Sequence, residues 1–415
     1  MKFIADFHLH SKYSRATSQD MNLENLAKWA EIKGIKVLGT GDFTHPLWFK
    51  YLKENLEPVE TGLFKLKEKD NDTRFLLTTE VSCIYSKKGK VRKIHILIFV
   101  PSFNIAEKIN VQLSWIGNLN SDGRPILGLD AKELTKIVLN ISSDCIIAPA
   151  HLMTPWFSLF GSKSGFDSLE ECFEEYSSSI WAGETGLSAD PAMLWRMPAG
   201  RQLCLISNSD SHSPQKIGRE ANVFDTELNY SAIKEAIKTK DATKFLFTIE
   251  FFPEEGKYHF DGHRNCQIRL SPQETKKYNG ICPVCGKPLT IGVLSRVEEL
   301  ADRAEGFIPQ THIPFKSLVP LEEIIADVLN QGIGAKGVGQ EYKNLIKKFN
   351  SEFNILLDVS RKDLEISTLP EIAEAIIRVR EGKIIKEPGY DGVYGKIKIF
   401  SPAEKKEITT QKTLF

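Results

Sequence analysis

Short apolar runs alternate with helical patterns over the first 250 residues, and this alternation restricts the fold more than any other feature of the sequence. Residues 2–10 alternate with the period of a strand, residues 22–34 carry apolar side chains at helical spacing, and residues 37–40 follow as a second strand. Further strands are predicted at residues 75–81, 94–100, 145–149, 179–182 and 203–207. Repeated β-then-α units predict a parallel sheet, either open or closed into a barrel. The strands at 75–81 and 94–100 are joined by a short stretch rich in lysine and glycine, so this pair is alternatively a hairpin.

The sequence pattern changes after about residue 249. From about residue 249 to residue 294, prolines, glycines and cysteines replace the β/α rhythm, and residues 296–400 have a mainly helical pattern. We therefore expect four parts: a β/α unit over residues 1–250, a small module over 251–295, a helical domain over 296–400 and a flexible tail over 401–415.

Composition limits the class of protein. A chain of 415 residues is long enough for two or three domains. No apolar run reaches the length of about eighteen residues that a membrane span needs, and the first residues lack the features of a signal peptide, so we expect a cytoplasmic protein. Because 54 basic residues balance 54 acidic ones, a nucleic-acid partner would have to be held by local basic patches.

Histidines and carboxylates stand at or beside the ends of the predicted strands. In parallel β/α barrels, catalytic groups gather where several strands end. The residues in these positions are His8, His10, Asp42, Glu80, His95, His151, Asp210 and His212. A single histidine at a strand end is ordinarily structural, but five of the nine histidines together with three carboxylates indicate a metal site.

The types of these residues indicate the chemistry. Neutral imidazole and carboxylate ligands suit zinc, manganese or iron, and no thiolate is among them. A bridging carboxylate such as Glu80 would hold two ions about 3.5–4 Å apart, a pair that activates water and stabilises both the attacking and the leaving oxygen of a phosphoester. We therefore predict hydrolysis rather than redox chemistry, with zinc, manganese or magnesium as the ion. The predicted catalytic residues are His8, His10, Glu80 and Asp210.

The strand-end motifs resemble those of the polymerase-and-histidinol-phosphatase (PHP) family: His8-Leu9-His10-Ser11, the Gly41-Asp42 turn, Glu80, His95, His151 and Asp210-Ser211-His212. The resemblance covers about residues 1–250. It implies a distorted seven-stranded β/α barrel that holds up to three metal ions and hydrolyses phosphoesters. It further implies that one ion is held by His8, His10, Glu80 and Asp210, and a second by Glu80, His95 and His151.

A third ion position departs from the pattern of that family. Many relatives supply a histidine soon after the first motif, where this chain has Arg15, and another directly after the aspartate, where it has Phe43. His212 and Asp42, together with His45, remain as ligands for a third ion. Arg15 is either a surface arginine or a permanent positive charge beside a phosphate.

A second kind of metal site is predicted after residue 250. His263, Cys266, Cys282 and Cys285 form two closely spaced pairs, which is how closed tetrahedral zinc sites are built, and His259 is an alternative to His263. Such a zinc ion would be structural, because the small module has too little core to fold alone. The remaining cysteines are predicted to be buried thiols: Cys83, Cys145, Cys172 and Cys204.

Two segments are candidates for contacts with a nucleic-acid backbone. Residues 87–93 form a basic turn that includes Lys87 and Lys88. Residues 331–339 are rich in glycine, and backbone amides in such a loop can hold a phosphate with the help of Lys336. Each segment is alternatively an ordinary solvated turn.

The order of these parts resembles the endonuclease Q branch of the PHP family over almost the full length of the chain. The shared features are a barrel, the segments 258–263, 282–286 and 289–294, and a helical C-terminal region. Those relatives nick DNA 5′ of deaminated bases (uracil, hypoxanthine and xanthine) and of abasic sites. The resemblance implies a DNA repair endonuclease, associated with the nucleoid, whose zinc module and C-terminal region hold DNA while the barrel cuts it. Inspection of a base would favour its extrusion into a pocket, for which Trp156, Phe157 and Phe160 are either stacking residues or core.

Two other functions are compatible with parts of the sequence. A small-molecule phosphomonoesterase of histidinol-phosphatase type would explain the barrel, but not the zinc module or the additional helical region. An inactive PHP scaffold beside a DNA-binding zinc module would explain the second metal site, but degenerate sites usually lose some of their ligands.

The final residues, Gln411 to Phe415, resemble the short peptides that dock into sliding clamps. Leu414 and Phe415 would fill an apolar pocket while Gln411 hydrogen-bonds at its edge. The match is to the five-residue bacterial form, and a tail without function is the alternative.

Overall fold

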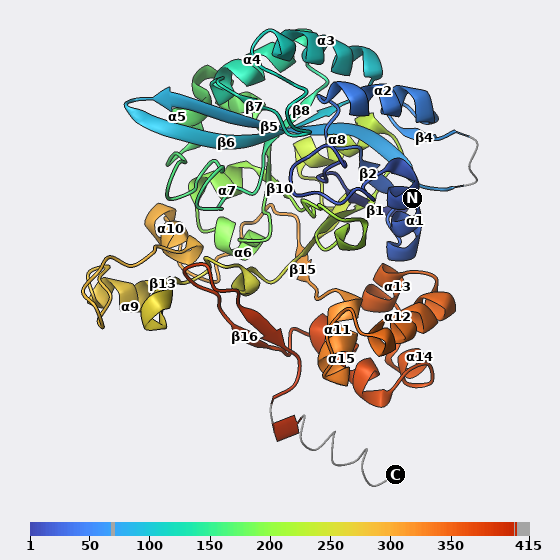
Figure 1. Cartoon of the computed structure of the whole chain (residues 1–415), viewed down its shortest axis with the longest axis vertical. Coiled ribbons are helices and arrows are strands. Elements are labelled where there is room, and N and C mark those ends of the chain that lie inside the picture. Colours follow the sequence, from blue (N-terminus) through green and yellow to red (C-terminus); the bar gives the residue numbers. More distant parts are fainter. Residues whose placement is uncertain (68–70, 402, 405–415) are drawn as a thin grey trace.

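The computed structural model describes residues 1–67, 71–401 and 403–404, and it is a mixed α/β protein built on one large sheet (Figure 1). The described strands of this sheet are β1 (Lys2–Asp6), β2 (Val37–Gly39), β3 (Leu56–Pro58), β4 (Phe64–Leu66), β5 (Arg74–Lys87), β6 (Lys90–Val100), β7 (Ile126–Leu127), β8 (Ile146–Pro149), β11 (Ala221–Asp225), β12 (Phe245–Glu250) and β15 (Phe315–Ser317). β1 pairs in parallel with β2, and β2 with β5, as the β-then-α pattern predicts.

The expectation of an all-parallel sheet is wrong, because the sheet is mixed: β7 is parallel to β5 and β15 to β12, but other pairs are antiparallel. β11 is antiparallel to β1 and β12 to β11, and β6 is antiparallel to both β5 and β8. The β5–β6 pair is antiparallel because only two residues join its strands, and parallel neighbours need a much longer crossover.

Hydrogen bonds among the described strands do not close the sheet into a barrel. β9 (Ala182–Glu184) and β10 (Cys204–Ile206) form a separate parallel pair, and β9 lies beside β8 without a ladder between them. Two local features account for this gap. β9 has three residues, and Pro149 at the end of β8 has no N–H group to donate.

Eight described helices of the first 250 residues pack around the sheet: α1 (Leu23–Lys33), α2 (Pro46–Asn55), α3 (Phe103–Ser114), α4 (Ala131–Ile141), α5 (Leu169–Phe173), α6 (Pro191–Leu194), α7 (Pro198–Gln202) and α8 (Tyr230–Thr239). α1 follows its predicted pattern. Asn22 caps it by accepting from the N–H of Asn25, and Gly34 ends it with a φ of 85°. Short 3₁₀ turns lie at Glu174–Ser179, Pro214–Lys216, Pro253–Glu255 and Arg264–Cys266.

β5 and β6 form a long antiparallel hairpin that projects beyond the neighbouring strands (Figure 1). Its pairing runs from Leu77 opposite Val100 to Lys87 opposite Lys90. The hairpin is therefore the correct one of the two interpretations of this pair. Because β5 continues well past residue 81, the basic turn lies at the tip of the hairpin and away from the body of the sheet.

The chain after β12 forms a small module and then a helical group. The module contains β13 (Asp261–His263), β14 (Ile268–Leu270), α9 (Pro272–Lys277) and α10 (Val293–Leu300). Its separate cluster of buried apolar residues consists of Leu270, Cys282 and Leu289. A core of this size contributes too little burial to hold a fold together without a further cross-link.

Five helices pack on one another beside α1 (Figure 1): α11 (Leu321–Leu329), α12 (Lys336–Phe349), α13 (Glu352–Leu357), α14 (Arg361–Glu365) and α15 (Pro370–Arg380). A buried ion pair fixes this group to α1, since Lys33 Nζ lies 2.6 Å from Glu352 Oε2. The described chain ends with the hairpin of β16 (Ile385–Glu387) and β17 (Lys396–Lys398). Among the described residues, no helix combines the length and the apolar character that crossing a bilayer requires.

Candidate metal-binding active site

Six of the predicted ligands converge in two groups at one end of the sheet. In each group, one potential ligand atom per residue lies within 4.8 Å of the others. The first group is His8, His10 and Asp210, and the second is Glu80, His95 and His151. The residues come from the ends of β1, β8 and β10 and from both strands of the β5–β6 hairpin, so strands far apart in the sequence build one site.

The Glu80 carboxylate joins the two groups. Its Oε1 lies 2.8 Å from His95 Nδ1 and 3.1 Å from His151 Nε2. Its Oε2 faces the other group, at 3.3 Å from His10 Nε2 and 3.6 Å from His8 Nε2. One oxygen therefore belongs to each group, which is the arrangement that a carboxylate shared by two metal ions requires.

The atoms of the first group lack partners, and this fits a metal ion. His8 Nε2, His10 Nε2 and Asp210 Oδ1 are buried and make no hydrogen bond, although His10 Nε2 and Asp210 Oδ1 are 3.1 Å apart. Unpaired buried polar atoms are costly, so a set of three around one centre indicates a common partner. Imidazole nitrogens and carboxylate oxygens are the ligands that zinc and manganese take.

Two further carboxylates orient the histidines. His8 Nδ1 lies 3.0 Å from Glu184 Oε1, and His10 Nδ1 lies 3.0 Å from Asp42 Oδ1. With Nδ1 held by a carboxylate, each ring directs its Nε2 to the site, which is the orientation that metal-binding histidines adopt. Glu184 also accepts from the N–H of His151 at 2.9 Å, so one carboxylate supports residues of both groups.

Asp42 has this supporting position rather than that of a ligand. Its two oxygens accept from His10 Nδ1, from the N–H and Oγ of Ser11 and from Ser14 Oγ, at 2.6–3.0 Å. The carboxylate is fully buried and its acceptor sites are in use, and neither group of ligand atoms includes it. The expectation that Asp42 binds a metal ion directly therefore gains no support from the geometry.

The ligands expected for a third ion are not assembled among the described residues. Phe43 is buried in the core, and His45 stacks on Tyr13 with ring centroids 4.4 Å apart. His212 lies at the edge of the site, where its ring centroid is 4.6 Å from that of His10. Among the described ion pairs, its carboxylate partner is Asp210, whose Oδ1 lies 3.8 Å from His212 Nδ1.

Three residues of the site have left-handed backbone, which is unusual without glycine. The φ angles are 49° at Asp42, 29° at His151 and 46° at Asp210. Such conformations cost energy and persist where the surroundings enforce them, and they cluster at functional sites. Here they turn the chain sharply just after β2, β8 and β10, and so direct the side chains toward one centre.

The electrostatics of the site favour positive charge at its centre. Burial lowers the pKa of His8, but Glu184, Asp210 and Glu80 outweigh burial and raise this pKa well above its ordinary value. Burial lowers the pKa of His95 to about 4, so that ring is neutral and free to act as a ligand. Burial raises the pKa of Glu80, but His95, Arg124 and His8 hold it well below its usual range. The carboxylate is therefore ionised.

Two crystal structures are similar to this one over nearly the whole chain. That of the lesion-specific endonuclease PfuEndoQ from Pyrococcus furiosus is 32% identical, has a TM-score of 0.86, and is matched over 96% of this chain and 95% of that one. That of endonuclease Q in complex with a 27-mer duplex substrate, with an abasic lesion at the active site, is 32% identical with a TM-score of 0.84 and 98% of both chains covered. The chain belongs to the endonuclease Q family.

Two further relatives are proteins described as uncharacterized. YqxK of Bacillus subtilis is 30% identical over 418 residues, which cover 96% of this chain and 99% of YqxK. MJ0043 of Methanocaldococcus jannaschii is 37% identical over 275 residues, or 63% of this chain, and the match spans a third of the length of MJ0043 (33%). The family model named MJ0043 C-terminal domain matches residues 320–383, which contain α11–α15.

This endonuclease Q family member also brings the four predicted zinc ligands together. His263, Cys266, Cys282 and Cys285 form one group with ligand atoms within 4.8 Å of each other, and Cys285 Sγ lies 3.4 Å from His263 Nδ1. Burial raises the pKa of Cys282, but the N–H groups of Cys285 and Val284 with neighbouring side chains outweigh it and lower this pKa to about 7. A thiolate is therefore accessible near neutral pH. His259, the alternative ligand, is buried against Phe260 and does not belong to the group.

The basic residues proposed to contact DNA differ in their availability. The ammonium group of Lys87 is already paired within the protein. Its Nζ lies 2.9 Å from Glu174, 3.2 Å from Asp130 and 2.8 Å from the carbonyl of Cys172. Lys88 is at the exposed tip of the hairpin, about 25 Å along the strand from Glu80. The tip of the turn is therefore distant from Glu80, because the intervening chain is an extended strand.

Two further basic residues are exposed. Lys336 begins α12, so the second half of the glycine-rich segment is helix rather than loop. Arg15 has a side chain that is 74% exposed, and its Nε lies 3.3 Å from Asp122 Oδ2.

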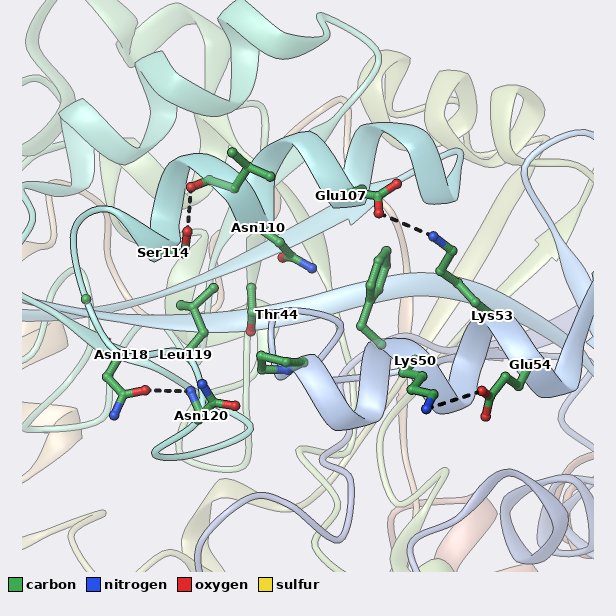
Figure 2. A pocket seen from close by; sticks show the side chains of 14 residues that line it. Thr44, Lys50, Lys53, Glu54, Glu107, Asn110, Ser114, Asn118, Leu119 and Asn120 are labelled. Atoms are coloured by element: carbon green, nitrogen blue, oxygen red, sulfur yellow. Dashed lines mark hydrogen bonds and ion pairs between the residues drawn. The ribbon is translucent and has the colours of Figure 1, made fainter.

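A cavity of about 710 Å³ lies between α2 and α3, outside the metal site (Figure 2). Its charged side chains pair with each other, Lys50 with Glu54 along α2 and Lys53 with Glu107 between α2 and α3. Its floor includes Thr44, and one wall is the loop of residues 117–120. That loop continues directly into residues 122–124, which reach the metal site.

Sequence reasoning missed Glu184 and Arg124. Glu184 ends β9, so its position at a strand end was the same signal that identified the other ligands. Arg124 comes from a loop of Gly, Asp and Ser, and no periodicity marks it; its guanidinium donates to Glu80 Oε2 at 2.9 Å.

Proposed function

We propose that this protein is a DNA repair endonuclease that hydrolyses the phosphodiester 5′ of a deaminated base (uracil, hypoxanthine or xanthine) or of an abasic site. The observation that carries the proposal is the Glu80 carboxylate, which serves two groups of unpaired ligand atoms in a chain that matches endonuclease Q from end to end. The duplex with an abasic lesion in one of those structures supports damaged DNA as the substrate class.

The residues of this chain have distinct tasks in that reaction. His8, His10, Glu80 and Asp210 would hold one divalent ion, and Glu80, His95 and His151 a second. Such ions activate water and stabilise the charge that develops on a phosphoester. Glu184 and Asp42 contact the Nδ1 atoms and so direct Nε2 of each imidazole to the site, which sets the orientation of the two rings before an ion arrives. Zinc fits this ligand set, and manganese or magnesium are the other candidates.

We extend the proposal to the division of the chain. Residues 1–250 would be a PHP barrel with an open seam between β8 and β9, and residues 251–295 a zinc module with a structural ion. Residues 296–400 would be a DNA-contacting helical domain, with Lys336 at the start of α12 and Lys88 and Arg15 as further backbone contacts. Support comes from the exposure of these three cations.

Of the three aromatic residues after His151, Trp156 is the best candidate for stacking on an extruded base. Trp156 is 40% exposed, and its ring centroid lies 5.7 Å from that of Tyr258. Phe160 is fully buried, and Phe157 packs on His95. Trp156 therefore combines an accessible face with a rigid support beside the ligands.

A panel of end-labelled duplexes tests the proposed function. Each carries one uracil, hypoxanthine, xanthine or abasic site, with an undamaged duplex as control, and each is incubated with and without manganese or magnesium. We expect a single nick 5′ of the lesion that chelation abolishes. Turnover of phosphomonoesters without any nicking would instead favour a histidinol-phosphatase-type activity, and DNA binding without cleavage under any metal would favour a scaffold.

The sliding-clamp peptide at Gln411–Phe415 lies outside the described residues and remains a proposal from the sequence. A tether to a clamp would raise the local concentration of the nuclease on duplex DNA. Fluorescence anisotropy with a peptide of the last fifteen residues measures the interaction. An absence of binding to bacterial and archaeal clamps at about 100 μM would exclude a useful tether.

A further inference from the structure

Arg124 places a guanidinium inside the metal site. Its NH1 donates to Glu80 Oε2 at 2.9 Å, on the oxygen that faces His8 and His10. The side chain is 27% exposed, so one side contacts the buried carboxylate and the other is open to solvent. Burial lowers the pKa of Arg124, but Glu80, Asp210 and Asp122 outweigh burial and raise it, so the charge is permanent.

The loop that carries Arg124 is fixed on both sides. The N–H of Gly123 donates to the carbonyl of Tyr13 at 3.0 Å, and the carbonyl of Pro125 accepts from the N–H of Ser82 at 2.9 Å. A Cβ at Gly123 would lie 2.2 Å from Asp42 Oδ2, so a side chain cannot be accommodated at this point. The loop is thus packed against the carboxylate that orients His10, and Arg124 cannot leave the site by a loop movement alone.

Asp122 links Arg124 to the second arginine of this region. Its Oδ1 accepts from the N–H groups of Arg15 and Arg124, at 3.3 and 3.2 Å, and its Oδ2 pairs with the Arg15 side chain. The Asp122 side chain is almost completely buried, so it holds the backbone at Arg15 and the backbone at Arg124 in fixed positions relative to each other. One arginine points into the site, and the other lies exposed at its mouth.

We propose that Arg124 is a catalytic residue that contacts a non-bridging oxygen of the scissile phosphate and supplies the third positive charge of the site. The inference rests on the proposed function. It is motivated by the geometry described above, in which the expected ligands of a third ion are not assembled and a guanidinium stands beside the shared carboxylate instead. The fork of guanidinium donors matches phosphate oxygens and stabilises the charge that they gain in the transition state.

Arg124 takes no part in proton transfer in this scheme. The oxygen of water bonds to phosphorus as one P–O ester bond breaks, and the departing oxygen is protonated at the expense of water. The guanidinium remains charged throughout, because its pKa lies far above neutral.

The test compares Arg124→Ala and Arg124→Lys with the wild-type protein. Arg74→Ala is the matched control, since Arg74 starts β5, the strand that carries Glu80, and pairs with Glu60 at 2.8 Å, away from the metal ligands. Single-turnover cleavage of a duplex with one abasic site should fall about 10²- to 10³-fold in Arg124→Ala at saturating metal. Arg124→Lys should recover part of this loss, and Arg74→Ala should cleave at the wild-type rate.

Two measurements that do not depend on cleavage complete the test. Metal analysis of Arg124→Ala should give the wild-type number of ions. The slope of log affinity against log salt concentration for the metal-free protein and the duplex should decrease by about one phosphate contact, or about 0.9.

The outcomes separate this inference from the function on which it rests. Loss of an ion together with the rate would overturn it, because Arg124 would then merely support Glu80. Wild-type cleavage with an unchanged salt slope would also overturn it and leave the endonuclease intact. A wild-type protein that cuts no damaged duplex would remove the proposed function, and this inference with it.

Discussion

At the scale of single residues, two buried carboxylates decide how the histidines of the metal site are oriented. Glu184 and Asp42 accept from the Nδ1 atoms of His8 and His10, so the opposite nitrogens face the site. The sequence predicted the ligands because each stands at a strand end. It did not separate ligands from their supports, since an aspartate after β2 and one after β10 have the same chemistry and differ only in what they contact.

Glu184→Gln should weaken metal binding to the first group about 10- to 100-fold, because an amide is a poorer acceptor for His8 and carries no charge. Competition with a chromogenic chelator measures the affinity. Glu170→Gln, at an exposed position of α5, is the control. Equal affinities for the Glu184 variant and the wild-type protein would show that this carboxylate does not tune the site.

Asp210→Ala removes a ligand and should lower the rate of nicking about 10³-fold or more, equivalent to about 4 kcal/mol of transition-state stabilisation. The fold should persist, because the residue lies in a loop after β10. Gel assays of an abasic duplex and circular dichroism melting check the two statements. Near wild-type nicking with a full complement of metal would contradict the assignment.

At the scale of elements, the positions of several strands were predicted closely, but the direction of pairing was predicted for only part of the sheet. β8 and β10 lie within a residue or two of their expected ranges, because buried apolar runs flanked by turn residues define them. The parallel direction was wrong for the pairs β1–β11 and β11–β12, whereas the short connection between β5 and β6 had indicated a hairpin as one of two interpretations. The outer half of β5 mixes serine, tyrosine and lysine at a half-exposed surface, so its periodicity is weak.

The small module that contains Cys266, Cys282 and Cys285 should depend strongly on its proposed zinc ion. Cys282→Ser should release about one zinc ion per chain and loosen the turn around Gly286, because a cluster of three buried residues provides little other stabilisation. Affinity for DNA should fall, and the ions of the site around Glu80 should stay bound. Metal analysis and anisotropy with a duplex measure both effects. Cys145→Ser, which replaces a buried thiol of the sheet region, should lose no zinc.

At the scale of the whole molecule, a pair of buried carboxylates makes stability depend on pH. Burial raises the pKa of Glu250, at the end of β12, to about 8, and burial with the nearby Glu250 and Glu184 raises the pKa of Glu220 as well. These two carboxyl groups therefore bind more protons in the folded protein than in the unfolded chain between about pH 4.5 and 8. Their contribution to the stability of the fold should fall as the pH rises through this window.

Glu250→Gln removes one of these ionisations and should stabilise the protein on the alkaline side, by a few kcal/mol at most. At pH 5, where Glu250 is protonated in the folded state, the unfolding midpoints of variant and wild type should be similar. By pH 9 the variant should unfold at the higher temperature. Thermal melts at intervals between these values test this, and parallel curves would show that Glu250 does not govern the pH dependence.

The Glu80 carboxylate, with one oxygen facing each ligand group, affects how two metal ions bind to the site. Because each of its oxygens faces a different ligand group, an ion in one group immobilises the side chain that the other group needs. The ordering entropy is then lost once for two ions, and the second binds to a ligand already in place. Loading should therefore be cooperative, with a Hill coefficient above one for metal-dependent activity. Such a protein would respond to the supply of metal as a threshold rather than in proportion, and singly loaded molecules would be scarce.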